Sequence, residues 1–273
     1  MDKTTLRKLL IGEFTWKRLI RSVLFIYTFF ALYVFFRADS MIFLPPPASY
    51  QDTQDILKLP VTDSQQISAL HLPNPDATYT LLYIHGNAED LGDIRPKLED
   101  LHRWGFSVFA YDYRGYGTSD GKPSERNAYH DINAAFTYLT QQLKIPADQI
   151  IVYGRSVGGG AATALATQHP IAGLILESAF TSAFRVVAPF PLLPFDKFKN
   201  LQNLKKVRCP VLVMHGEADE IIPFHHGQTL YQAASDPKSF LWVPDAGHND
   251  FTWASGDRLQ QALVSFQQLL EQS

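Results

Sequence analysis

The sequence predicts an α/β protein whose mostly parallel, doubly wound sheet of eight strands carries helices on both faces. Continuous apolar runs at 80–85, 107–111 and 211–215 are typical of strands buried on both sides of a parallel sheet. Amphipathic segments with helical spacing separate these runs. Strands that alternate with helices of this length indicate βαβ units, and such units build a parallel sheet.

The predicted elements follow one another in a regular order. Short alternating runs within 48–76 are expected to form the first, antiparallel strands. Asp93 and Ser124 are expected to be the N-caps of the two helices that follow them. The parallel strands are expected at 80–85, 107–111, 150–153, 173–177, 211–215 and 239–243, and the later helices after residue 158, around 227–234 and near 258–270.

Composition limits the functions that this chain can have. Its 273 residues, 46% of them apolar, are enough for one large domain with a substantial core. The net charge of -3 gives no basic surface for nucleic acid, and no nucleic-acid-binding motif occurs. The single cysteine, Cys209, excludes an internal disulfide and a cysteine-based zinc cluster. We therefore expect small molecules, lipids or protein surfaces as partners, and no metal.

An apolar segment near the N-terminus, uncharged up to Arg37, is expected to be a membrane anchor. It covers residues 22–37 and follows a basic segment, 1–21. The segment is slightly short for a hydrocarbon core of ~30 Å, but the two apolar residues before Arg21 extend it if that arginine snorkels. The positive-inside rule then places the N-terminus in the cytoplasm and the rest of the chain on the extracytoplasmic side. A cleaved signal peptide fits less well, and a helix in the membrane interface or docked on the soluble domain is the remaining alternative.

One predicted strand leads into a serine between glycines. The apolar run 150–153 is followed by Gly-Arg-Ser-Val-Gly at 154–158 and then by small residues. A strand, a tight turn and a helix of small residues form the nucleophile-elbow pattern, which exposes the hydroxyl of Ser156 above the sheet. Taken alone, the motif could also be an ordinary glycine-rich turn. A P-loop and a dinucleotide fingerprint are excluded, because their required residues and spacing are missing.

Three chemically complementary residues each follow a predicted strand. Ser156, Asp219 and His248 come just after strand ends, and these ends lie at one edge of a parallel sheet. Their order along the chain is that of α/β-hydrolases. His248 is expected to remove the serine proton, and Asp219 is expected to fix the imidazole tautomer. Glu177 and Asp245 are the competing candidates for the acid.

The tetrahedral intermediate of such chemistry needs backbone donors for its oxyanion. The first predicted donor is the N–H of Val157, at the start of a helix. The second is the N–H of Asn87, whose side chain is also expected to contribute, because Gly86 lets that loop approach the serine. Arg155 is expected to lie near the entrance, where a solvated side chain is favoured and contact with substrate is the alternative.

The rest of the chain divides into a linker and a catalytic core. Residues 38–78 form the linker and the first antiparallel strands, and residues 79–273 form the core. Within the core, 179–206 interrupts the alternation of strands and helices with aromatic and proline residues. This segment is expected to be a minimal lid in which Phe180 and Phe184 contact substrate. Ordinary core packing is the alternative for each of these aromatic side chains.

Several motifs together resemble the α/β-hydrolase superfamily, specifically the membrane-associated abhydrolase-domain branch that includes protein depalmitoylases. The likeness covers about residues 40–270 and implies hydrolysis of an ester or thioester with Ser156, Asp219 and His248 as the triad. Depalmitoylases of this branch attach through a cysteine-rich N-terminus, whereas this chain has a hydrophobic segment there. The motifs are the runs 85–92, 111–117, 121–125, 153–158 and 247–250.

These features predict a membrane-anchored serine hydrolase that cleaves acyl esters or thioesters through an acyl-enzyme intermediate. A lipid or an acylated protein is a candidate substrate, and no cofactor is expected. The alternatives are a peptidase of the same fold and a catalytically inactive, membrane-bound binding protein.

Overall fold

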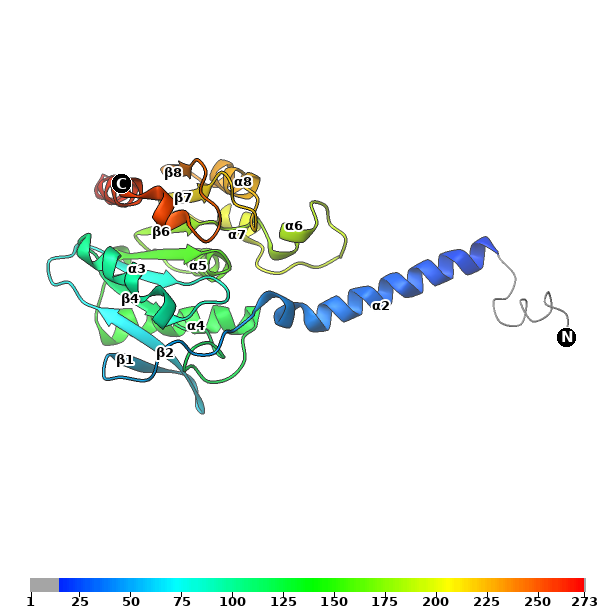
Figure 1. Cartoon of the computed structure of the whole chain (residues 1–273), viewed down its shortest axis with the longest axis horizontal. Coiled ribbons are helices and arrows are strands. Elements are labelled where there is room, and N and C mark those ends of the chain that lie inside the picture. Colours follow the sequence, from blue (N-terminus) through cyan, green and yellow to red (C-terminus); the bar gives the residue numbers. More distant parts are fainter. Residues whose placement is uncertain (1–14, 273) are drawn as a thin grey trace. The chain divides into compact units, whose positions relative to one another are not determined.

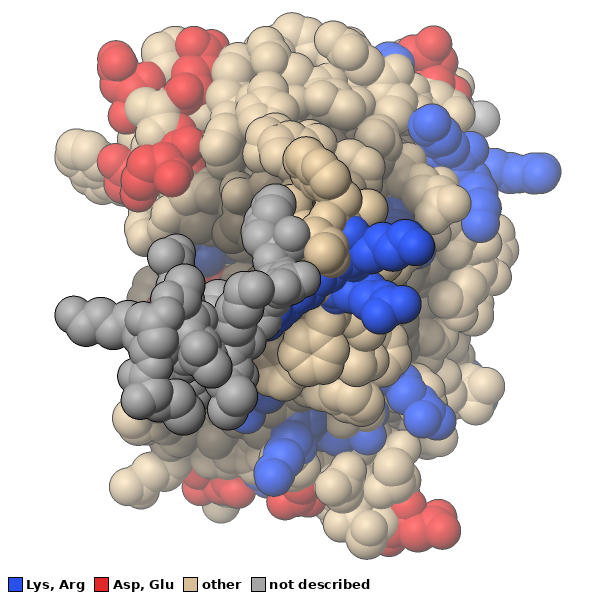
Figure 2. Space-filling model, turned by 90° about the vertical axis from the view of Figure 1, so that its right-hand side faces the viewer, with Lys and Arg blue, Asp and Glu red and all other residues tan. Residues whose placement is uncertain are grey.

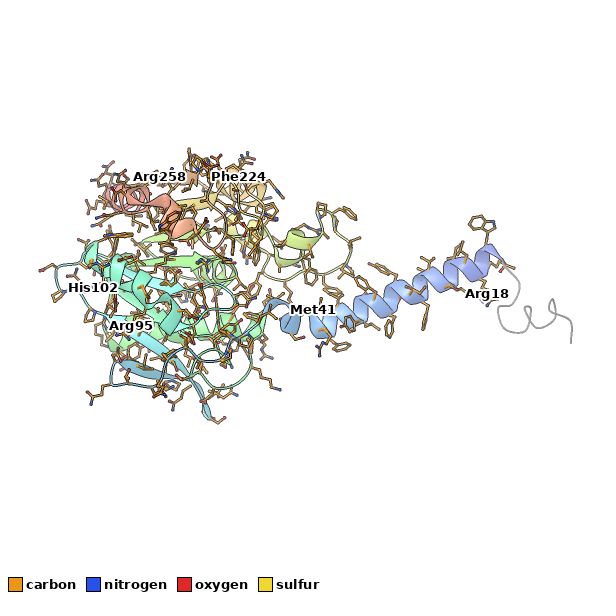
Figure 3. The ribbon with its side chains drawn as sticks, in the orientation of Figure 1. Arg18, Met41, Arg95, His102, Phe224 and Arg258 are labelled. Atoms are coloured by element: carbon orange, nitrogen blue, oxygen red, sulfur yellow. The ribbon has the colours of Figure 1, made fainter. Side chains whose placement is uncertain are left out.

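A computed structural model describes residues 15–272 and divides the chain into two compact units, with the boundary between Met41 and Ile42. The first unit contains all but the last residue of helix α2 (Trp16–Ile42), which is the one helix among the described residues that is long and apolar enough to cross a membrane (Figure 1). Large apolar side chains project from it along its whole length, between the labelled Arg18 and Met41 (Figure 3).

Helix α2 is longer than the predicted anchor. It begins before residue 22 and includes residues 38–42, which the sequence analysis placed in the linker. The prediction ended the segment at Arg37, the first charged residue after the apolar run. Helical hydrogen bonds do not depend on apolar side chains, so the helix continues through Arg37 and Asp39. At 1.5 Å per residue, its 27 residues span about 40 Å.

The second unit is built on one eight-stranded sheet with the order β1-β2-β4-β3-β5-β6-β7-β8. Strand β2 pairs antiparallel with β1 and with β4, and the other neighbouring strands pair in parallel. The predicted fold class is therefore confirmed. The strands are β1 (Ile56–Thr62), β2 (Gln65–Leu72), β3 (Thr80–Ile84), β4 (Ser107–Tyr111), β5 (Ile150–Arg155), β6 (Gly173–Glu177), β7 (Val211–Gly216) and β8 (Lys238–Val243).

Helices cover both faces of this sheet and create two hydrophobic cores. In β3, Leu82 and Ile84 belong to one core, and Leu81 and Tyr83 belong to the other, because successive side chains of a strand point to opposite faces. The first core includes residues of α4 (Glu125–Thr137), α5 (Gly158–Ala166) and α8 (His225–Ala233), and the second includes residues of α3 (Leu91–Arg103), α9 (Phe251–Ser255) and α10 (Asp257–Glu271).

Local capping determines where the first two large helices begin. Ser124 caps α4 as predicted, since its side chain accepts the N–H of Asn127 at 3.1 Å. Helix α3 is capped by Asp90, so the expectation for Asp93 was wrong. Asp90 has extended backbone angles, whereas Asp93 is already helical, and its side chain accepts the N–H of Asp90 as the second half of a capping box.

The segment 179–206 contains two short helices, α6 (Ala183–Val187) and α7 (Asn200–Leu204). The large side chains of Val187 at the end of α6, and of Phe190 and Leu192 between the two helices, are exposed. Elsewhere, α4 continues into a π-helical turn (Tyr138–Gln142), and a short 3-10 helix (Ala147–Gln149) leads into β5. On the surface, charged residues of both signs form separate groups (Figure 2).

Candidate active site

The turn after β5 places Ser156 in a strained backbone conformation. Its φ angle is 52°, in the left-handed region that residues other than glycine rarely adopt. Gly154 makes the turn possible, because a Cβ atom there would lie 2.6 Å from the carbonyl oxygen of Gly158. The N–H of Ser156 donates to the carbonyl oxygen of Glu177 at 2.8 Å, which fixes the turn to β6.

The structure brings the three predicted triad residues together. Nε2 of His248 lies 3.1 Å from Oγ of Ser156, and Nδ1 of His248 lies 2.8 Å from Oδ2 of Asp219. Ser156, Asp219 and His248 are 7%, 6% and 5% exposed, so the contacts are shielded from bulk water. They follow β5, β7 and β8, three strands whose carboxyl ends lie at one edge of the sheet.

Asp219 is held as an ionised carboxylate. Its Oδ1 accepts the N–H groups of Ile221 and Ile222 at 3.0 and 2.7 Å. Burial tends to raise the pKa of Asp219, but hydrogen bonds from His215 and His248 outweigh burial and keep the pKa well below its usual value. A carboxylate only accepts hydrogen bonds, so Nδ1 of His248 carries a proton and Nε2 is left to accept the serine proton.

The carboxylates of the two competing acids have other surroundings. Glu177 is fully buried between Lys97 and Arg155, and Asp245 is an exposed turn residue with a positive φ angle. Neither carboxylate is a recorded hydrogen-bond partner of His248 in the described part of the chain.

Two backbone N–H groups beside Ser156 have no recorded acceptor among residues 15–272, namely those of Val157 and Asn87. The loop of Asn87 passes close to the serine, since a Cβ on Gly86 would lie 3.5 Å from Cβ of Ser156. Val157 immediately precedes helix α5, whose N-terminal dipole favours negative charge. The two groups can therefore act as donors toward an oxyanion.

The side chain of Asn87 has a different role from the one expected. Its Nδ2 donates to the carbonyl oxygen of Ile42 at 2.7 Å, and its Oδ1 accepts the N–H of Leu44 and the hydroxyl of Tyr116 at 2.9 and 2.6 Å. These bonds occupy the side chain and tie its loop to the start of the second unit. Only the backbone N–H of Asn87 stays available.

The two aromatic residues predicted to contact substrate lie in different surroundings. Phe180 is 4% exposed and belongs to the first core, where its ring centroid lies 6.5 Å from that of Phe198. Phe184 is half-buried in α6 and packs edge to face on Phe195 at 5.8 Å. Phe180 thus takes part in core packing, and Phe184 lies in the predicted lid.

The sequence analysis missed two charged residues close to the elbow. Glu89 accepts a hydrogen bond from Arg155 at 2.7 Å, and Lys97 donates to Glu177 at 2.7 Å. Glu89 lies in a polar loop and gives no signal in the sequence. Lys97 does give one, because it falls on the same helical face as the buried Ile94 and Leu101.

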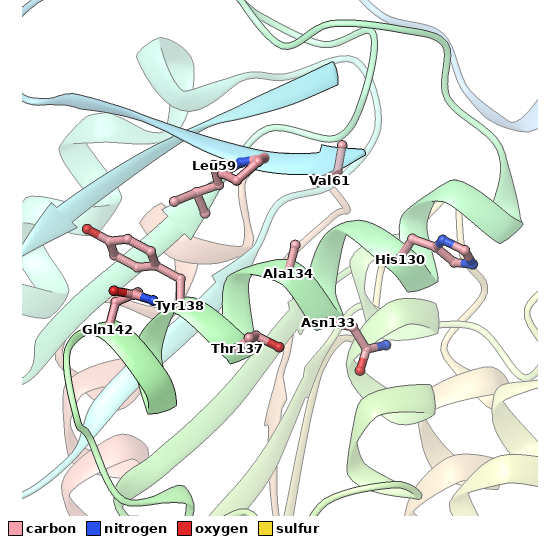
Figure 4. Close-up of a pocket in the computed structure, with 9 residues that line it drawn as sticks. Leu59, Val61, His130, Asn133, Ala134, Thr137, Tyr138 and Gln142 are labelled. Atoms are coloured by element: carbon pink, nitrogen blue, oxygen red, sulfur yellow. The ribbon is translucent and has the colours of Figure 1, made fainter. Parts of the chain in front are cut away.

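A separate groove lies between the edge strand β1 and helix α4 (Figure 4). It has a volume of about 700 Å³ and an apolar base that includes Leu59 and Val61, with Asn133 and Thr137 on the helical side. None of the predicted site residues lines this groove.

Comparison with known proteins finds a family model and several relatives that are similar to part of this chain. A family model described as serine aminopeptidase, S33, matches residues 75–201, a range that ends before Asp219. The alpha/beta hydrolase domain-containing protein aho-3 of Caenorhabditis elegans is 44% identical over 184 residues, which are 65% of this chain and 54% of that protein. Human alpha/beta hydrolase domain-containing protein 17B is 43% identical over 180 residues, 65% of this chain and 62% of that protein. The chain thus spans little more than half the length of these relatives.

Solved structures share the fold at low sequence identity. The Pyrococcus furiosus esterase Pf2001 gives a TM-score of 0.69 at 19% identity over 82% of this chain and 97% of the esterase. An alpha-beta serine hydrolase homologue from Coxiella burnetii gives a TM-score of 0.62 at 17% identity over 80% of this chain and 99% of that chain.

Proposed function

Because the chain belongs to the α/β-hydrolase superfamily, we propose that it is a membrane-anchored serine hydrolase that cleaves a carboxylic ester or thioester of an acyl substrate. The observation that carries the proposal is the continuous set of contacts from Asp219 through His248 to Ser156. A nucleophile, a base and an orienting acid in hydrogen-bond contact are the constellation that acyl transfer requires.

In the acylation step, Oγ of Ser156 attacks the carbonyl carbon while its proton passes to Nε2 of His248. Asp219 stabilises the imidazolium that forms, and the N–H groups of Val157 and Asn87 donate to the new oxyanion. Collapse of the tetrahedral intermediate breaks the bond to the alcohol or thiol. The leaving group takes the proton from His248, and an acyl-serine ester remains.

Deacylation repeats these roles with water. His248 removes a proton from water as the water oxygen attacks the acyl carbon, and the same two N–H groups stabilise the second oxyanion. Return of the proton to Oγ of Ser156 releases the carboxylic acid and restores the resting state. Side chains of this chain perform every proton transfer, so the scheme needs no further group.

The substrate class and the location follow from the apolar parts of the chain. Helix α2 is long enough to anchor the protein, and the predicted lid exposes apolar side chains. A lipid or an acylated protein at a membrane fits this arrangement. By the positive-inside rule, the basic residues of segment 1–21 support an N-terminus in the cytoplasm and a hydrolase unit on the extracytoplasmic side. Protection of the hydrolase unit from external protease in sealed, cytoplasm-out vesicles tests this orientation, and its digestion there would contradict it.

A fluorophosphonate probe tests the proposed nucleophile directly. We expect the probe to label the wild-type protein and to fail with Ser156→Ala, which should also lower kcat by about 10⁶-fold because no other group replaces the nucleophile. Ser178→Ala is the matched control, since Ser178 is also buried, follows the next strand of the sheet and has a positive φ angle. Labelling that persists in Ser156→Ala, or disappears in Ser178→Ala alone, would exclude Ser156 as the nucleophile.

A peptidase is the second candidate, and the description of the matching family model favours it. The same triad would then attack an amide. The segment 179–206 is short for a domain that selects peptides by size. Hydrolysis rates for p-nitrophenyl acyl esters and for aminoacyl amides separate the two functions, because an esterase of this kind should leave the amides unchanged.

A further inference from the structure

We propose that Arg155, the residue before the candidate nucleophile, is a positioning residue that fixes the nucleophile, base and oxyanion loops relative to one another. The inference rests on the proposed function, because it assigns a role within the same site. Arg155 is 9% exposed, so the expectation of a solvated side chain was wrong. Its partners lie far away in the sequence, and the motif itself gave no sign of them.

One guanidinium group contacts three separate segments. Its Nη2 donates to the carbonyl oxygen of His248 at 3.1 Å, and its Nη1 donates to Oε1 of Glu89 at 2.7 Å. Its Nε lies 3.4 Å from Oε1 of Glu177, at the end of β6. Arg155 itself ends β5 directly before Ser156. A hydrogen bond therefore joins the backbone of His248, the candidate base, to Arg155, the residue next to the candidate nucleophile.

Glu89 extends this connection to the oxyanion loop. The carboxylate oxygen that accepts from Arg155 also accepts the N–H of Gly86 at 2.5 Å. A Cβ on residue 86 would lie 2.7 Å from Nη1 of Arg155, so any larger residue would displace the guanidinium from this position. The close packing of Arg155, Glu89 and Gly86 sets the path of the chain immediately before Asn87.

The charges around Arg155 balance in number. Arg155 and Lys97 are cations, and Glu89 and Glu177 are anions, with the Lys97 ammonium 2.7 Å from Glu177. Buried ions are tolerated when they are paired and hydrogen-bonded, as these are. Lysine could not replace Arg155, because it offers one point charge where the planar guanidinium donates in several fixed directions.

Kinetics of full-length variants distinguish positioning from simple stabilisation. In Arg155→Met, we expect kcat for a p-nitrophenyl acyl ester to fall by about 100-fold with little change in KM, because small displacements of reacting groups cost this much. Arg155→Lys keeps the charge and should still lower kcat, since it loses the fixed geometry. In Glu89→Gln, the amide oxygen can still accept from Gly86, so this variant removes charge while retaining shape.

The pH profile gives a readout that stability alone would not move. Asp219 contacts the imidazole of His248, Glu220 and Arg155 contact the His248 backbone, and Glu89 is paired with Arg155. Removing the cation in Arg155→Met favours the imidazolium, so the acid limb of kcat/KM should move to higher pH. Removing an anion in Glu89→Gln should move the same limb to lower pH.

Arg114→Met is the matched control, because Arg114 is a second buried arginine paired with a carboxylate, Asp131, at 2.7 Å. It should lower stability and leave the pH profile unchanged. Unshifted profiles in both Arg155→Met and Glu89→Gln, with activity lost only in proportion to folded protein, would overturn the role of Arg155. If Arg155→Met does not fold, the two other variants test the role of Arg155. A shift of the acid limb to lower pH in Glu89→Gln and a low kcat in Arg155→Lys support that role. Absence of fluorophosphonate labelling in the wild type would instead overturn the proposed function.

Discussion

Two buried carboxylates lie at neighbouring strands of the sheet, and only one of them reaches the histidine. Glu177 is the last residue of β6, and Asp219 follows β7 by three residues. Both lie at the carboxyl edge of the sheet, and both have a pKa below the usual value despite burial. Their positions in the sequence make them almost equivalent candidates for the acid.

Their partners differ in kind. Burial tends to raise the pKa of Glu177, and the Lys97 ammonium and the Arg155 guanidinium reverse this effect. The Arg155 guanidinium keeps its charge at every relevant pH. Asp219 instead contacts the imidazoles of His215 and His248 and two backbone N–H groups. A carboxylate beside a neutral imidazole can stabilise a charge that appears during the reaction, whereas Glu177 is already neutralised.

Of the changes at these two carboxylates, Asp219→Asn is expected to have the largest effect. This change keeps the shape of the side chain but lets it donate to Nδ1 of His248, which favours the wrong tautomer. We expect kcat to fall by about 10⁴-fold while the protein stays folded. The measurement is steady-state hydrolysis of a p-nitrophenyl ester together with a thermal unfolding curve.

Asp245→Asn is the control for this variant, because Asp245 is an exposed acid three residues before His248 in the sequence. It should retain nearly full activity. If kcat falls less than tenfold in Asp219→Asn, or falls equally in Asp219→Asn and Asp245→Asn, the distinction between Asp219 and Glu177 would be wrong.

The second effect concerns stability and comes from Glu177→Gln. Removing this charge leaves Lys97 and Arg155 buried without their shared carboxylate, so the free energy of unfolding should fall by about 3–5 kcal/mol. Chemical denaturation measures the loss. Glu99→Gln removes an exposed partner of Arg95 and should cost less than about 1 kcal/mol. Similar losses in the two variants would show that Glu177 does not compensate the buried cations.

The sequence contains enough information for the fold and for the candidate triad. Strands buried on both faces must be apolar throughout, so β3, β5 and β7 are visible as continuous runs. The tight turn at Ser156 requires small residues around it, and those are visible too. Parallel strands then bring Ser156 and His248 together although 92 residues separate them.

Other features depend on contacts that the sequence does not encode locally. Asp90 and Asp93 are both suitable caps for α3, and only the backbone angles select Asp90. Arg155 looks like a solvent-exposed side chain because its partner Glu89 lies 66 residues away. The loop of Asn87 passes close to the serine, but the side-chain partners of Asn87, Ile42 and Leu44, come from the start of the second unit.

The smallest expected effect is a change in the pH dependence of stability. The pKa of Asp219 and that of Glu177 are both lowered in the folded state, so each carboxylate stabilises the fold above its unfolded pKa of about 4. This contribution disappears as the pH falls through the folded value, because protonation removes the favourable charge. The wild-type free energy of unfolding should therefore decrease with acidification below about pH 4.

Glu177→Gln and Asp219→Asn should each make this decrease less steep, since each removes one group that binds a proton only reluctantly in the folded protein. Urea titrations at pH values between about 2.5 and 5 measure the slope for both variants and the wild type. The two carboxylates differ in function but share this electrostatic consequence of burial beside favourable partners. An unchanged slope in Glu177→Gln alone would mean that its two cations do not lower its pKa, and the contrast with Asp219 would then rest on geometry rather than on charge.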